Sequence, residues 1–143
     1  MRADRGHAAV EFGLAVGLLL IPAALAVVSF GPWSAARVFT ESAAAEASRA
    51  AVISLDAVSG EAVVSEMASN HGYDSSSVRL GWCGADPVPI GGGNGVCSMG
   101  RGTDVEVQVM VFTPMFSTPW GAVGGVWVSG AHAEPVDLYR SIP

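Results

Sequence analysis

The chain has 143 residues, a formal net charge of −6, and hydrophobic residues at 50% of its positions against 14% that are charged. Soluble domains carry about 25% charged residues, so this chain is unusually poor in charge. The acidic balance argues against a nucleic-acid-binding protein, which normally presents a basic face. All 7 basic residues are arginines, so Schiff-base and P-loop chemistry, which need lysine, are excluded. The length excludes a large multidomain enzyme.

The first element expected is a membrane-spanning helix over residues 12–30. This run contains no charge and a single hydroxyl residue, Ser29. At 1.5 Å per residue it covers about 28 Å, close to the ~30 Å hydrocarbon core of a bilayer. Arg2 and Arg5 precede the run and the next arginine is Arg37. The positive-inside rule therefore predicts a single-pass protein of the cytoplasmic membrane, with its N-terminus inside and its C-terminal domain outside.

A second helical stretch is expected over residues 33–71, which are rich in alanine and carry apolar side chains at helical spacing. Gly31–Pro32 predicts a break or bend between the two stretches, and Pro22 a kink inside the span. Gly60 is a weak point for helix, and Asn70–Gly72 favours the end of the stretch. A single rod through both stretches would be about 95 Å long.

Residues 72–143 predict a small antiparallel sheet of about three strands. Alternating apolar and polar residues indicate strands at 77–82, 104–111 and 125–133. An apolar turn over 113–124 is expected to pack back on the helix. The expected fold class is therefore α+β, in which a long N-terminal helix continues outside the membrane and packs on the sheet.

Cys83 and Cys97 predict a disulfide in the outer domain. The compartment is oxidising, the cysteine count is even, and closing a loop of about 15 residues would stabilise the fold by roughly 3 kcal/mol. The alternative is an unlinked pair of small apolar side chains. The connection over 84–102 is long for a compact domain, and loops of this size tend to be functional or poorly ordered.

The chain offers little for catalysis, and we expect neither an enzyme nor a bound metal or cofactor. The GGGNG run at 91–95 lacks the lysine and hydroxyl residue of a P-loop, which favours a flexible loop. His7, His71 and His132 are dispersed, without ligands at metal-site spacing. Asp104 and Glu106 share one face of a strand, as paired carboxylates do, but an exposed alternating face explains them without chemistry.

Glu11 is the one charged residue that this explanation does not cover, because it lies at the edge of the apolar run. A carboxylate carried toward the bilayer centre costs about 2–3 kcal/mol. A carboxylate in the first turn of a helix can instead complement the helix dipole at headgroup depth. Gly6 is followed by four residues and then by Glu11 and Phe12, which lead into the apolar run.

This context resembles the prepilin processing signal of the tight-adherence (Flp) branch of type IV pilins. The string RGHAAVEFGLAVGLLLIPAALAVV is similar to the N-terminus of TadE-like minor pseudopilins, which commonly have R-G-x-A-A-V-E-F-A-L before a leucine-rich, proline-containing helix. The segment ESAAAEASRAAV is similar to the alanine- and arginine-rich continuation in that family. TadF-type relatives share the pattern and stay open as an alternative.

The resemblance implies that a prepilin peptidase cuts between Gly6 and His7. The chain would then comprise a leader (1–6), a transmembrane helix (7–32), an extracytoplasmic amphipathic helix (33–71) and a disulfide-containing sheet domain (72–143). Glu11, followed by Phe12, would act as an assembly carboxylate, paired in lipid with the new amine of a neighbouring subunit. Implied partners are the peptidase, other pilins or pseudopilins, the tight-adherence assembly platform in the inner membrane, and the lipid bilayer. No nucleic acid is implied.

Two other interpretations remain open from the residues alone. In a secreted domain, the apolar run would be a signal peptide cut after the A-x-A sequence at residues 24–26. In a membrane-anchored extracellular binding domain, the span would stay uncut. In the pilin interpretation, small residues would let the span pack closely against other pilin helices: Gly13, Gly17, Ala23, Ala24 and Ala26.

Overall fold

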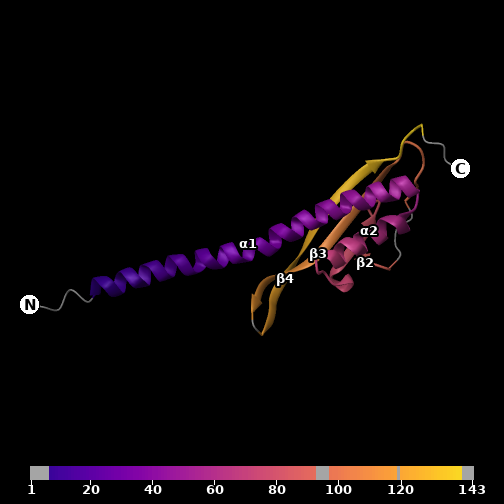
Figure 1. Ribbon diagram of the computed structural model, residues 1–143. Coiled ribbons are helices and arrows are strands. Elements are labelled where there is room, and N and C mark those ends of the chain that lie inside the picture. Colours follow the sequence, from indigo (N-terminus) through magenta and orange to yellow (C-terminus); the bar gives the residue numbers. More distant parts are fainter. Residues whose placement is uncertain (1–6, 93–96, 119, 140–143) are drawn as a thin grey trace, which may run out of the picture.

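The computed structural model describes residues 7–92, 97–118 and 120–139 (Figure 1). Its elements are α1 (His7–Ser54), α2 (Ala57–Asn70), the 3-10 helix η1 (Ser75–Ser77), β1 (Val78–Trp82), β2 (Val88–Pro89), β3 (Asp104–Thr118) and β4 (Gly121–Pro135). The sheet order is β2-β1-β3-β4, and each neighbouring pair is antiparallel. The expected α+β fold is confirmed. The sheet has a fourth strand because β2 forms where the sequence predicts only a loop.

α1 continues as one helix through Gly31 and Pro32, so of the predicted break or bend the structure contains no break. Proline removes one helical hydrogen bond, and the turns on either side keep theirs. The local side chains support the helix: the Ser34 hydroxyl donates to the Gly31 carbonyl over 2.9 Å, and the Phe30 and Trp33 rings lie 5.3 Å apart. At 48 residues, α1 is about 72 Å long.

The long helix ends at Ser54, so the two predicted helical stretches do not form a single rod to residue 70. Leu55 adopts a left-handed conformation with φ 57°, and the Asp56 N–H donates to the Ala51 carbonyl over 3.2 Å, as in a Schellman motif. The Asp56 carboxylate then accepts the Val58 N–H over 3.1 Å and caps α2. α2 ends at Asn70, as predicted.

α2 folds back along α1 to form a helical hairpin. Gly60, predicted as a weak point, is the residue that permits this packing. A Cβ at this position would lie 2.5 Å from the Trp82 ring and 2.7 Å from the Ala47 carbonyl oxygen. At the other end of α2, the rings of Phe39 and Tyr73 lie 4.7 Å apart.

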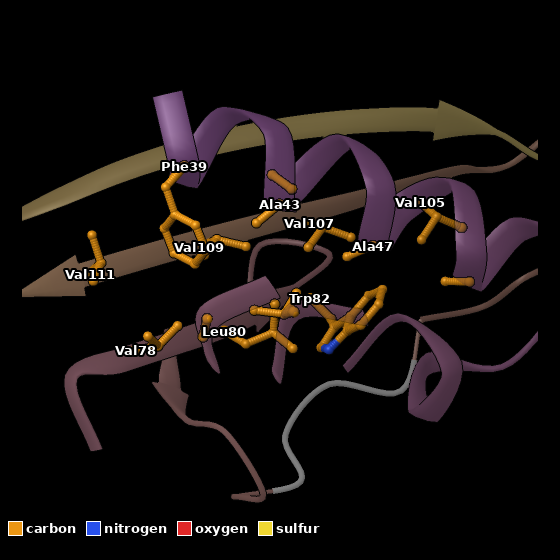
Figure 2. Packing of buried hydrophobic residues seen from close by; sticks show 14 of the residues in the cluster. Phe39, Ala43, Ala47, Val78, Leu80, Trp82, Val105, Val107, Val109 and Val111 are labelled. Carbon is orange, nitrogen blue, oxygen red and sulfur yellow. The ribbon is translucent and has the colours of Figure 1, made fainter. Parts of the chain in front are cut away.

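The core lies between the C-terminal half of α1, α2 and one face of the sheet. Figure 2 shows the alanine-rich face of α1 laid over the valines of β3, with Leu80 and Trp82 of β1 nearby. The buried α1 side chains recur every three or four residues: Ala36, Phe39, Ala43, Ala44, Ala47 and Ala51. The buried β3 side chains are Val105, Val107, Val109 and Val111, which alternate as predicted. Small side chains let the helix backbone approach the sheet closely.

β3 and β4 extend further than the sequence predicts and form a long hairpin. Their pairing continues from Thr113↔Val126 to Thr118↔Gly121, so residues 113–124 are not a turn. The far part of this hairpin bends away from α1 beside the middle of the helix (Figure 1). The expectation that this apolar segment packs back on the helix is therefore wrong for its tip, where Trp120 is 93% exposed. It holds only at the base, where Thr113 is buried.

Candidate membrane and assembly surface

The N-terminal half of α1 contacts almost nothing else in the described chain. The most apolar window of this helix is entirely exposed, and α1 is long and apolar enough to cross a membrane. Its exposed large side chains surround the helix: Val10, Phe12, Leu14, Leu18, Leu19, Leu20, Ile21, Leu25, Val27, Val28 and Phe30. A helix that is apolar all round and unburied is suited to lipid rather than to water.

The residues of the predicted processing signal lie at the start of α1. Gly6, with the whole predicted leader 1–6, lies outside the described residues. His7 is the first residue of the helix, and Glu11 and Phe12 follow about one turn later, both exposed. Among the described residues, no hydrogen bond or ion pair reaches the Glu11 carboxylate.

Two of the small residues of the span, Gly13 and Gly17, lie in a shallow strip on this exposed helix, whereas Ala23, Ala24 and Ala26 do not line it. A Cβ added at Gly13 or Gly17 would meet nothing within 4 Å. Their neighbours on this strip are Leu14, Leu18, Ile21 and Pro22. Gly13 and Gly17 are four residues apart and therefore lie on one face of the helix, where a second helix could approach closely.

An apolar groove joins α1 to the base of the β3–β4 hairpin. Its volume is about 250 Å³, and its lining residues are Ala26, Phe30, Trp33, Thr113, Pro114, Met115 and Val126. The Thr113 hydroxyl is buried and has no hydrogen-bond partner within the described ranges. Sequence reasoning missed this groove. The signal was the apolar alternation beyond residue 111, which continues the strand.

The face of the sheet that no helix covers carries an aromatic cluster. The Arg79 guanidinium lies 4.4 Å from the centre of the Trp127 ring, and Phe112 meets the same ring edge-on at 5.4 Å. Asp104 and Glu106 are exposed on this face, as the alternating pattern predicts.

The disulfide is confirmed between Cys83 and Cys97, whose Cα atoms are 5.8 Å apart. It closes the connection that contains β2, and the Glu61 carboxylate of α2 accepts the Gly91 N–H from the same connection. Of the GGGNG run, only Gly91 and Gly92 are described, and both are in a turn or bend.

The titratable groups serve local structure. His71 follows α2, with Nδ1 2.9 Å from the Met67 carbonyl oxygen, and His132 lies 3.3 Å from the Glu134 carboxylate. Partial burial raises the pKa of the Tyr73 phenol, and hydrogen bonds from Ser76 lower the pKa of the Asp74 carboxyl. Within the part of the chain that the structure describes, no three His, Cys, Asp or Glu residues are grouped to hold a metal ion.

No family model, curated protein or solved structure matches this chain.

Proposed function

We propose that this protein is a non-enzymatic, membrane-anchored pseudopilin that takes part in assembling or priming a tight-adherence (Flp) pilus. In this proposal a prepilin peptidase removes residues 1–6. The mature subunit then joins other pilins and the assembly platform of the inner membrane. The sheet domain lies outside the cytoplasmic membrane.

The observation that carries the proposal is the division of α1 into two unlike halves. Residues 36–52 bury one face against the sheet, whereas the large apolar side chains of residues 12–30 are mostly exposed in the described chain and meet the hairpin only at the groove beside Ala26 and Phe30. Such a helix anchors a folded domain in lipid and leaves a free helical surface. The strip containing Gly13 and Gly17 gives that surface a place where another pilin helix can pack.

Glu11 supplies the specific assembly contact in this proposal. Its carboxylate has no partner in the described chain and precedes the apolar run directly. In lipid, a carboxylate needs a cation. The α-amine created at His7 of a neighbouring subunit would provide that cation, so the pairing would favour association only of processed subunits.

N-terminal sequencing of the exported protein tests the processing step. We expect the mature chain to begin at His7. A chain beginning at Val27 would show that a signal peptidase releases a secreted domain. A chain that keeps Met1 or Arg2 would show an uncut anchor. Either of these results overturns the proposal.

The replacement Glu11→Ala tests the assembly contact. Breaking a buried ion pair costs about 3–5 kcal/mol, so we expect incorporation into pili to fall more than about tenfold while membrane insertion and cleavage persist. Glu46→Ala is the matched control, because Glu46 is an exposed carboxylate on the same helix, paired with Arg49 at 3.5 Å. Co-purification of each variant with sheared pili measures incorporation. Full incorporation of the Glu11 variant would remove the proposed role of this residue.

A further inference from the structure

The β3–β4 hairpin beyond the sheet, residues 113–126, is here called the distal hairpin. It carries several exposed apolar side chains. Trp120 at its tip is 93% exposed, and Met115 and Val123 are 50% and 56% exposed. No charged residue occurs between Phe112 and Ala131.

The position of the distal hairpin along α1 gives a physical reason for this composition. Its base meets Ala26, Phe30 and Trp33 in the apolar groove. If residues 12–30 span a bilayer, the outer lipid surface falls at Phe30–Trp33. The distal hairpin bends sideways from α1 at this same level (Figure 1). It would therefore lie along the membrane surface.

The charged residues of β3 and β4 lie where a position of the hairpin on the membrane surface would require them. Asp104, Glu106 and Glu134 lie at the end of the sheet far from the hairpin, where β3 begins and β4 ends. β3 and β4 carry no charge from Phe112 to Ala131, while Arg79 of β1 pairs with Met110 next to this uncharged stretch. In this placement β3 and β4 direct their charged ends to water and their uncharged ends toward the span.

The aromatic residues at this level are those that favour a membrane interface. Tryptophan is enriched at headgroup depth because its ring is apolar and its N–H is polar. Trp33 on α1 and Trp120 on the distal hairpin both lie on this side of the domain. Thr113, whose buried hydroxyl lacks a partner among the described residues, lines the same groove as Trp33.

We propose that the distal hairpin is a second membrane contact, which lies on the outer surface of the bilayer that α1 spans and places Trp120 at headgroup depth. The occupant of the groove at its base is lipid of the outer leaflet. This inference rests on the membrane placement in the proposed function. It adds a point of attachment that holds the sheet domain against the membrane.

Spin labels on the full-length chain in phosphatidylcholine–phosphatidylglycerol vesicles test this proposal. The two native cysteines form the disulfide, so a nitroxide reacts only with an introduced cysteine. Val123→Cys reports on the hairpin while keeping Trp120. Leu138→Cys is the matched control, since Leu138 is a similarly exposed apolar residue, at 63%, near the other end of the sheet. Leu18→Cys reports on the span.

For each nitroxide label, we compare its accessibility to oxygen, which enters lipid, with its accessibility to a nickel chelate, which stays in water. We expect the label at 123 to be several-fold less accessible to nickel than the label at 138, and the label at 18 to be accessible only to oxygen. In the Val123→Cys background, Trp120→Glu should restore nickel access, whereas Trp120→Phe should not.

The outcomes separate the two proposals. If the labels at 123 and 138 are equally accessible to nickel while the label at 18 is in lipid, the hairpin contact is overturned and the membrane anchor stands. If nickel reaches the label at 18, the membrane placement of α1 is overturned, and the hairpin contact is overturned with it.

Discussion

The two halves of α1 share one continuous backbone and an apolar composition, yet they have different surroundings. Residues 10–30 carry leucine, valine, isoleucine and phenylalanine side chains that are mostly exposed. Residues 36–52 carry mainly alanine on the face that meets the sheet. Large apolar side chains all round a helix suit a liquid hydrocarbon solvent. Small side chains on one face suit close packing against a rigid sheet. Side-chain size therefore separates the exposed half from the packed half better than hydrophobicity does.

The largest expected difference between the halves comes from removing a phenylalanine from each. Phe39 is 1% exposed and packs against Tyr73, so Phe39→Ala should lower the free energy of unfolding by about 4 kcal/mol. Phe12 is 72% exposed, so Phe12→Ala should leave the outer domain as stable as before. Urea unfolding of the full chain in detergent micelles, followed by tryptophan fluorescence, measures both. An equal loss of unfolding free energy in the two variants would show that the two halves of α1 do not differ in their packing.

Adding a methyl group to a glycine also tests the difference between the packed and the exposed half of α1, by overfilling the packing instead of removing a side chain. A Cβ at Gly130 of β4 would lie 2.5 Å from the Glu41 nitrogen, so Gly130→Ala must push the sheet away from α1. Such overpacking costs about 1–3 kcal/mol. Gly13→Ala is the control, because it meets nothing within 4 Å. Thermal unfolding of both variants measures the difference, and an unchanged Tm for Gly130→Ala would contradict the close approach.

A smaller effect is expected at the junction where α1 ends and α2 begins. Asp56→Ala removes the carboxylate that accepts the Val58 N–H, and loss of such a cap costs about 1 kcal/mol. Asp56→Asn retains an acceptor and should retain most of the stability. Hydrogen exchange of the first α2 amides reports on the cap locally. Unchanged protection in the alanine variant would argue that tertiary packing alone holds this junction.

The smallest effect expected is a pH dependence at Asp74, which caps η1 through the Ser76 N–H at 2.8 Å. This hydrogen bonding lowers the pKa of the Asp74 carboxyl below its ordinary value of 3.8. Because folding favours the ionised form, the stabilisation is complete above that ordinary value and is lost as pH falls through the lowered pKa. An NMR titration of the carboxyl carbon measures the shift. Asp74→Asn should abolish this part of the acid dependence.

The local patterns predicted the elements of this fold better than their extent. The alternation from Asp104 to Val111 and the apolar run of residues 12–30 each act within a few residues, and both predictions hold. The end of α1 depends on the left-handed Leu55 and the cap at Asp56. The sequence analysis did not identify Asp56 as a cap, and Gly60 is the stronger helix breaker by propensity. Tertiary packing against Trp82 overrides that propensity.

The candidate surface was predictable only in part, because part of it depends on tertiary contacts rather than on local sequence. The free apolar half of α1 follows from its composition alone. The groove between Phe30 and Met115 does not, because it requires residues about 85 positions apart to meet. Prolines at 114 and 119 suggested a turn, whereas the strands pair through this region to Thr118↔Gly121. The role of Glu11 stays a prediction.

The two prolines inside α1 have a mechanical consequence. Each leaves the carbonyl four residues before it without its helical donor, which makes the helix easier to bend at that turn. Pro22 and Pro32 are ten residues apart, which at 100° per residue places the two gaps about 80° apart around the helix axis. The helix can therefore bend in two nearly perpendicular planes, one at each proline. When the sheet domain is pulled in any direction, the N-terminal half of α1 could change its tilt relative to the packed half, and the packed half would keep its contacts.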